Sequence, residues 1–184
     1  LALADLGRFA EAERAFERAS ARFARDGGAG GILAVNALAN EAYTVSEQGR
    51  VVEAQAMFER AAAQLRALGE FDNPRLLRMR FNWGATLRKL DRLEEARAVV
   101  EDALALARAK LDAGHLRIAE GEVELARLDL AEGGTEAKRS AAVESARTRV
   151  AAAEAIAAKK APSPVFARNL AAARAELAAQ AGTG

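Results

Sequence analysis

The sequence contains no cysteine, one histidine and few aromatic residues, and each shortage excludes a class of protein. Without cysteine the chain has no disulfide, no thiol nucleophile and no thiolate metal site. A single histidine, His115, cannot form a histidine metal cluster. Aromatic residues are only 5% of the chain although hydrophobic residues are 51%, so the apolar content is mostly alanine and leucine, which favour helices over strands. We therefore expect a helical protein without a metal or cofactor.

An excess of charge of either sign is also missing, as are long apolar segments. The 27 basic and 26 acidic residues leave a formal net charge of +1, which predicts that nucleic acid is not a partner. No apolar run approaches the roughly 18 residues of a membrane span, so we expect a soluble, cytoplasmic protein that does not bind membranes. The chain opens at Leu1, within what reads as the tail of a helix. We interpret it as a piece of a longer protein, in which a targeting signal can lie upstream.

The stretch from Phe81 to Ala103 reads as two helices joined by a short turn. In both halves, small and apolar residues recur at the spacing of one helix face: Trp83, Gly84, Leu87 and Leu90, then Leu93, Ala96, Val100 and Ala103. The polar segment between them, around Asp91, is too short to be anything but the turn of a helical hairpin. Gly84 and Ala96 indicate close approach of two helices, since glycine inside a helix costs about 1 kcal/mol against alanine.

The same turn recurs along the chain at a fixed interval. Gly7, Gly49, Asp91 and Gly133 each occupy it, and successive members of this series are 42 residues apart. Such regularity over three consecutive intervals predicts an array of repeated hairpins.

The order of residues within each unit resembles the tetratricopeptide repeat, whose first helix carries a large apolar, a small and an apolar residue, and whose second carries alanine, a larger apolar residue and alanine. The segment from Gly69 to Pro74 is similar to the connector of the 42-residue variety of this repeat, found in kinesin light chains and in bacterial multidomain signalling proteins. Asp112 to Leu116 is a second such connector, with leucine in place of proline. The resemblance implies an all-α right-handed superhelix of about four hairpins and a C-terminal capping helix.

On this interpretation residues 1–184 form one array. Repeats are expected at 1–26 (truncated), 32–68, 74–111 and 116–160, with a capping helix at 164–181. Four glycines within residues 26–31 predict a break between the first two repeats. The fourth repeat departs from the pattern, because Asp129 stands where Leu87 stands in the repeat before it. Its second helix is rich in alanine, so we expect it to pack less tightly.

Few side chains suggest catalysis, and we expect that the protein is not an enzyme. His115 lies in a connector where the resemblance already expects a histidine, which favours a structural role. Acidic residues occur beside arginines, as in Glu94 and Glu95 with Arg97, and such neighbours are typical of a solvated helix face. Trp83 could stack on a ligand, but its position in the repeat favours the core.

Two asparagines form the one group of residues that suggests a binding function. Asn40 and Asn82 lie 42 residues apart, each two residues before the small residue of a first helix. In tetratricopeptide arrays the first helices line the concave surface, and asparagines at this position resemble a ladder that holds a peptide backbone, which a carboxamide can do with its donor and its acceptor. The other residues expected on this face are Asn36, Tyr43, Glu47, Arg78, Arg88 and Lys89. Glu124 replaces asparagine in the fourth repeat, and both asparagines could instead bond only to a neighbouring helix.

Two functions fit these observations. The first is a scaffold that binds a peptide or helix of a partner protein in its concave groove. The second is a regulatory or self-association segment that packs against an effector domain, such as a kinase or transcription regulator, in the same polypeptide. The sequence does not separate them, because both use the same surface chemistry.

Overall fold

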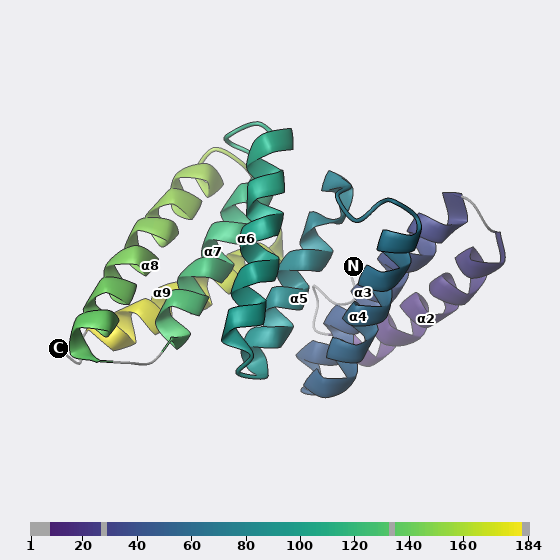
Figure 1. Ribbon diagram of the computed structural model, residues 1–184, viewed down its shortest axis with the longest axis horizontal. Coiled ribbons are helices and arrows are strands. Elements are labelled where there is room, and N and C mark those ends of the chain that lie inside the picture. The colour runs from purple at the N-terminus through teal and green to yellow at the C-terminus, as the bar shows by residue number, and fades with distance from the viewer. Residues whose placement is uncertain (1–7, 27–28, 133–134, 182–184) are drawn as a thin grey trace. The chain divides into compact units, whose positions relative to one another are not determined.

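The computed structural model describes residues 8–26, 29–132 and 135–181, and over these ranges the protein is almost entirely helical (Figure 1). Its α-helices are α2 (Phe9–Asp26), α3 (Ala29–Glu47), α4 (Val51–Ala67), α5 (Leu77–Lys89), α6 (Leu93–Lys110), α7 (Leu116–Ala131), α8 (Glu136–Ala157) and α9 (Pro164–Ala181). A short 3-10 helix, Pro74–Leu76, precedes α5. No strand occurs among the described residues, and the prediction of an all-α protein is confirmed.

The described turns lie where the 42-residue interval places them. Gly49 joins α3 to α4 and Asp91 joins α5 to α6, and both adopt the left-handed conformation, with φ of 84° and 59°. This shared conformation explains the glycine at position 49, because a residue without Cβ adopts it most readily. The predicted turns at Gly7 and Gly133 lie outside the described residues.

One predicted break is wrong in its extent. We expected the glycines of residues 26–31 to stay out of helices, but α3 begins at Ala29 and includes Gly30 and Gly31. A Cβ built on Gly31 would lie 3.4 Å from the Leu68 side chain, so α3 packs closely beside the end of α4 at this point. Packing of this kind offsets the low helix propensity of glycine.

Both predicted connectors are held by side chains. Asn73 caps the 3-10 helix by accepting a hydrogen bond from the Arg75 backbone N–H at 3.0 Å. The guanidinium groups of Arg66 and Arg80 stack on the ring of Phe71, 4.3 and 4.6 Å from its centroid. These contacts fix the connector between α4 and α5.

In the second connector, His115 caps α7. Its Nδ1 accepts a hydrogen bond from the Arg117 backbone N–H at 3.1 Å. A ring nitrogen used in this way satisfies one of the free donors at a helix start, which is the structural role expected for this histidine.

The chain divides into two compact units, residues 1–90 and residues 91–184. In the first, α3 packs against α2 and α4, and α5 packs against both α3 and α4. In the second, α7 packs against α6 and α8, and α9 packs against both α7 and α8. Within each unit, helices that follow one another in sequence pack as adjacent pairs, consistent with helical hairpins. The superhelical arrangement of the hairpins stays a prediction.

The core of the first unit combines small and large apolar residues of α3 and α4. Leu38, Ala42 and Val45 of α3 and Ala54, Phe58 and Ala61 of α4 are all buried. Trp83 of α5 is buried as well, and its Nε1–H donates a hydrogen bond to Oε1 of Gln55 on α4 at 2.9 Å. Trp83 is therefore a core residue of this unit rather than an exposed stacking surface.

In the second unit, the apolar cluster shared by α7, α8 and α9 consists mainly of small side chains. α8 buries only Ala146, Val150 and Ala153, which agrees with the prediction of few large anchors. α9 contributes Phe166 and Ala173 to the same cluster. The apolar contact of α8 is therefore limited, and polar contacts carry more of its attachment.

Candidate functional site

The candidate site lies on α3 and α5, two helices that run side by side in the same direction. Oδ1 of Asn40 accepts a hydrogen bond from Nη2 of Arg78 at 2.8 Å. Further along both helices, Nζ of Lys89 donates to Oε1 of Glu47 at 2.9 Å. Both contact pairs advance towards the C-terminus together, so the helices are parallel. We call the surface that includes these four residues, with Asn36 and Asn82, the α3–α5 strip.

Asn40 is already occupied within the protein. Its side chain is only 8% exposed, and its carboxamide oxygen is held by Arg78. For this asparagine, the structure provides the interhelical hydrogen bond that we considered as the alternative to peptide binding. Removing the carboxamide would take a buried acceptor from Arg78, which predicts a loss of stability.

Asn36 and Asn82 differ from Asn40 in this respect. Asn36 lies one helical turn before Asn40 and Asn82 one turn after Arg78, so both adjoin the Asn40–Arg78 contact. Both are half-buried, and neither carboxamide makes a hydrogen bond with any side chain that the structure describes. Each carboxamide retains its donors and its acceptor for another molecule.

The remaining predicted residues occupy different environments. Tyr43 is buried, with 8% of its surface exposed, so it contributes to packing more than to an open surface. Arg88 is half-buried in the last turn of α5, one residue before Lys89. Glu47 is half-buried, and its contact with Lys89 neutralises both charges at that end of the strip.

Two hydroxyl residues of the strip were not predicted. Oγ1 of Thr86 lies 3.3 Å from Oγ of Ser46, and Nζ of Lys89 lies 3.2 Å from the same oxygen. Ser46 and Thr86 are nearly inaccessible and connect the two helices between the Asn40 and Glu47 contacts. They lie 40 residues apart rather than 42, so the repeat interval did not pair them.

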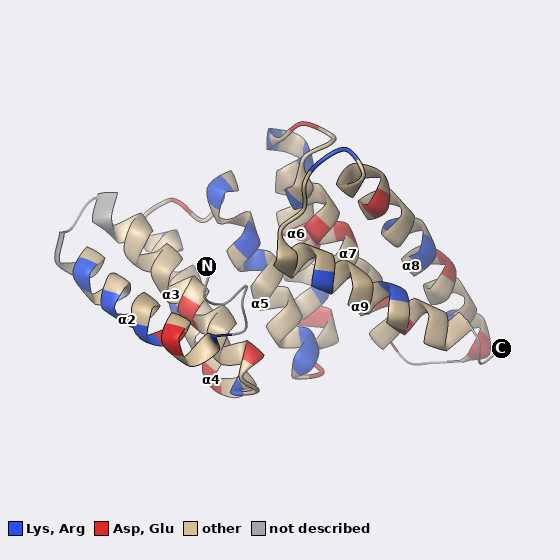
Figure 2. Cartoon of the chain, turned by 180° about the vertical axis from the view of Figure 1, so that it is seen from behind, with Lys and Arg blue, Asp and Glu red and all other residues tan. Residues whose placement is uncertain are grey.

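The strip combines unlike charges on its two helices. α5 contains four cationic residues and no carboxylate, and one of the four, Arg80, is buried against Phe71. The charged residues of α5 are blue in Figure 2. α3 contains two carboxylates and no cation, and only Glu47 reaches the cations of α5 in a direct contact. The balance on this surface is therefore positive on the α5 side.

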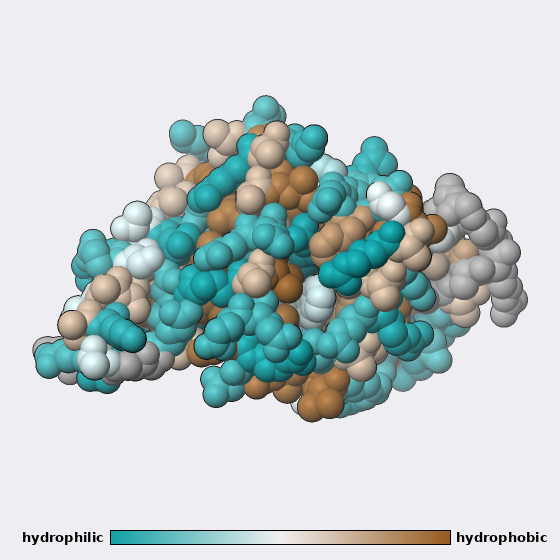
Figure 3. Space-filling view, in the orientation of Figure 1, coloured by the Kyte–Doolittle hydropathy of each residue, from teal (hydrophilic) through white to brown (hydrophobic). Residues whose placement is uncertain are grey.

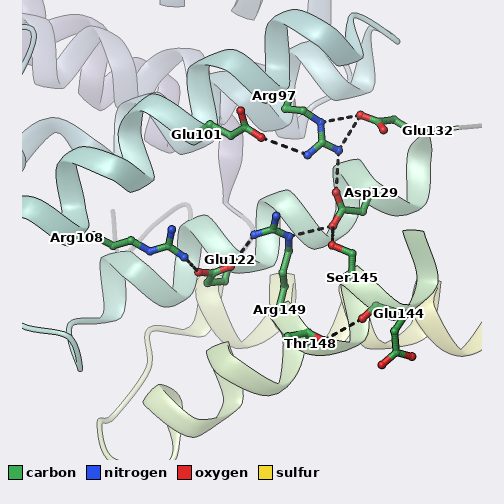
Figure 4. Close-up of polar contacts among 10 residues, drawn as sticks. All are labelled: Arg97, Glu101, Arg108, Glu122, Asp129, Glu132, Glu144, Ser145, Thr148 and Arg149. Atoms are coloured by element: carbon green, nitrogen blue, oxygen red, sulfur yellow. Dashed lines mark hydrogen bonds and ion pairs between the residues drawn. The ribbon is translucent and has the colours of Figure 1, made fainter. Parts of the chain in front are cut away.

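The second unit contains a buried polar network that sequence reasoning missed (Figure 4). Asp129 of α7 accepts hydrogen bonds from Arg97 of α6 at 2.8 Å and from Ser145 and Arg149 of α8 at 2.7 and 3.0 Å. Arg149 also donates to Glu122 at 3.0 Å, one heptad earlier on α7. The mismatch of Asp129 with Leu87 was the signal that could have revealed it.

Further contacts complete this network, which we call the α6–α8 network. Arg108 of α6 donates to Glu122, and Arg97 donates to Glu132 at 2.7 Å. Burial alone would lower the pKa of the Arg97 guanidinium, but its hydrogen bonds to Asp129 and Glu132 raise that pKa overall, so its charge is fixed. Each buried carboxylate thus meets two guanidinium groups, which indicates a structural role.

Arg97 therefore has partners other than those we expected. We placed it with Glu94 and Glu95 on a solvated face, whereas it reaches Asp129 on the next helix. Glu95 pairs instead with Arg92, three residues before it.

A pocket of about 540 Å³ opens at one end of α7, α8 and α9. Leu130 and Val143 contribute its apolar lining, and charged side chains such as Glu144 and Arg147 surround them. Glu144 and Arg147 pair with each other, at 2.5 Å. None of the residues predicted from the sequence lines this pocket.

Other classes of site receive no support from the described residues. Among them, no group of three acidic or histidine side chains is placed to hold a metal ion, and no helix is long and apolar enough to cross a membrane. The exposed large hydrophobic residues of the described ranges are Leu33, Val52 and Leu68. Figure 3 shows hydrophobic residues on the visible face in separate spots between hydrophilic ones.

No protein-family model matches this sequence, and no curated protein matches it. What the structure establishes is an all-α protein whose helices pack as adjacent pairs.

Proposed function

We propose that the chain is a tetratricopeptide-type array of the 42-residue kind and acts as a scaffold that binds a peptide or helix of a partner protein along the α3–α5 strip. The repeated left-handed turns at Gly49 and Asp91 support the repeat interval. The parallel course of α3 and α5 supports the assignment of both as first helices of successive hairpins.

The observation that carries the proposal is the unused hydrogen-bonding capacity of Asn36 and Asn82. Other polar residues of the strip, including Asn40, Ser46, Glu47 and Lys89, already contact one another or Arg78 across the two helices. A carboxamide can pair with both the N–H and the C=O of a peptide backbone without selecting a side chain. Two of them, on adjacent parallel helices, provide two fixed points for one segment.

Charge defines the partner further. The cations of α5 favour a segment that carries an acidic residue on the α5 side, as the sequence led us to expect. Arg78 adjoins Asn82 by one helical turn, so an acidic side chain next to a bound backbone amide lies within its reach. Arg78 keeps its contact with Asn40 in the absence of a partner.

The test combines capture with calorimetry. The wild-type chain is used to capture partners from a native lysate, and the bound segment is synthesised and titrated against the wild type and the Asn82→Ala and Asn36→Ala variants. Losing a carboxamide that pairs with a ligand backbone leaves that group unsatisfied and costs about 1 to 3 kcal/mol, or roughly 5- to 150-fold in affinity.

Asn169→Ala is the matched control, because Asn169 is also a half-buried asparagine of a helix but belongs to α9. Its affinity should equal that of the wild type. Thermal melts should be unchanged for Asn36→Ala and Asn82→Ala and lowered for Asn40→Ala. Unchanged affinity in the Asn36→Ala/Asn82→Ala double variant would contradict the proposal and favour packing against an effector domain through another surface.

A further inference from the structure

A half-buried carboxylate, Glu41, lies on α3 near charged residues of α2 and α4. With the side chains that the structure describes, Glu41 makes no hydrogen bond and no ion pair within 4 Å. A carboxylate that loses water without gaining a donor or a cation is destabilised in its charged form. No arginine or lysine side chain that the structure describes makes a direct ion pair with Glu41.

The charged groups around Glu41 come from α2 and α4. From α2, Glu13 and Glu17 repel its charge. From α4, Glu53 repels it and Arg60 attracts it. Of the cations of α5, which also packs on α3, Arg78 contacts Asn40 and Lys89 contacts Glu47.

Glu13 cannot relieve this repulsion, because it is held in its charged form. Its carboxylate accepts hydrogen bonds from Gln48 at 2.7 Å and from Arg50 at 2.8 Å, and these keep the pKa of Glu13 below its usual range. Burial, together with the charges of Glu17 and Glu13, raises the pKa of Glu41 to about 7. Glu41 is thus the member of this cluster that takes up the proton.

We propose that Glu41 makes the docking of α2 on α3 sensitive to pH, with α2 held when Glu41 is protonated and loosened when Glu41 ionises beside Glu13 and Glu17. The affected contact is the pairing of α2 with α3, which also includes the buried side chain of Ala12. This regulation does not depend on the function proposed for the α3–α5 strip.

The direction follows from proton linkage. The docked state binds the Glu41 proton more tightly than a state in which α2 has moved away, so docking is strongest at low pH and weakens as pH rises through about 7. We expect the equilibrium constant for docking α2 on α3 to fall about tenfold between pH 5.5 and 8. This is less than the full pKa shift of Glu41 implies, because its side chain is only half-buried.

Hydrogen exchange of the α2 amides, corrected for the pH dependence of intrinsic exchange, measures how strongly α2 is docked at each pH. Protection in α2 relative to α4 should fall about tenfold over this pH range in the wild-type chain. In Glu41→Gln, which is neutral at every pH, the ratio should stay constant and high. In Glu17→Gln, the midpoint of the fall should move to lower pH, because one repelling charge is gone.

Glu59→Gln is the control, since Glu59 is an exposed residue of α4 that accepts a hydrogen bond from Gln55 and is not among the charges acting on Glu41. It should reproduce the wild-type curve. A flat ratio in the wild type, or the same fall in Glu41→Gln, would overturn the proposal. An unmoved midpoint in Glu17→Gln would also overturn it, by showing that α2 is not the source of the repulsion.

Discussion

Residues 1–90 and residues 91–184 contain polar side chains within similar helical hairpins, but they use them differently. On the α3–α5 strip, the helices are joined by contacts such as Asn40 with Arg78, and the carboxamides of Asn36 and Asn82 make no hydrogen bond with a described side chain. In the α6–α8 network, Glu122 and Asp129 are each bound by two arginines. Saturated groups stabilise packing, whereas groups with spare capacity can bind another molecule.

The difference also shows in what holds each set of helices together. The first unit buries large side chains, including Phe58 and Trp83, so its polar contacts can be few. In the second unit, α8 buries only Ala146, Val150 and Ala153, and Arg149 and Ser145 add hydrogen bonds to Asp129 of α7. We infer that polar contacts with α7 supplement the limited apolar area of α8.

The largest expected effect tests the apolar side of this comparison. Trp83→Ala removes a buried aromatic ring and its hydrogen bond to Gln55, and should lower the free energy of unfolding by about 3 to 5 kcal/mol. Urea denaturation followed by circular dichroism measures it. Trp83→Phe keeps most of the ring area and should cost less. A loss below about 1 kcal/mol for Trp83→Ala would show that the ring is not a core anchor.

A smaller loss is expected from the charged side. Asp129→Ala leaves Arg97 and Arg149 without their shared acceptor and should cost about 2 to 4 kcal/mol, less than for a fully buried pair because both arginines are partly exposed. Hydrogen exchange should show the loss of protection in α8. Glu101→Ala, which removes only an exposed partner of Arg97, should change stability by less than about 0.5 kcal/mol. Equal effects of both changes would remove the distinction between network and surface.

The smallest effect concerns the turns that both units share. Gly49→Ala places a Cβ on a residue with φ of 84° and should cost about 1 kcal/mol in a thermal melt. Asp91→Gly relieves the same strain at the equivalent position and should change stability by a smaller amount in either direction. If Gly49→Ala raises the melting temperature, the turn does not require the left-handed conformation.

Much of the fold could be predicted because its signals are local. Proline at position 164 begins α9. Glycine at position 49 forms the turn between α3 and α4, where its positive φ favours a residue without Cβ. The extent of α3 was wrong because Gly30 and Gly31 belong to a helix that packs closely beside Leu68, a contact that no local pattern reveals.

The candidate site could be predicted only in part. The repeat interval identified Asn40 and Asn82 as candidates, and the resemblance to tetratricopeptide repeats predicted that they lie on neighbouring helices. It could not show that Arg78 occupies Asn40, because the two lie 38 residues apart and outside the interval. The two arginine partners of Asp129, Arg97 and Arg149, lie 32 and 20 residues away from it in the sequence. In the sequence, Asp129 therefore appeared as a mismatch with the repeat pattern rather than as part of a network.

The stacking of Arg66 and Arg80 on Phe71 has a consequence for recognition by α5. The connector before α5 is held without any ligand by its aromatic ring and by the cap at Asn73. Its conformational entropy is therefore lost on folding and not on ligand binding. A partner that contacts Arg78 or Asn82 meets a preorganised helix, and more of its contact energy appears as affinity.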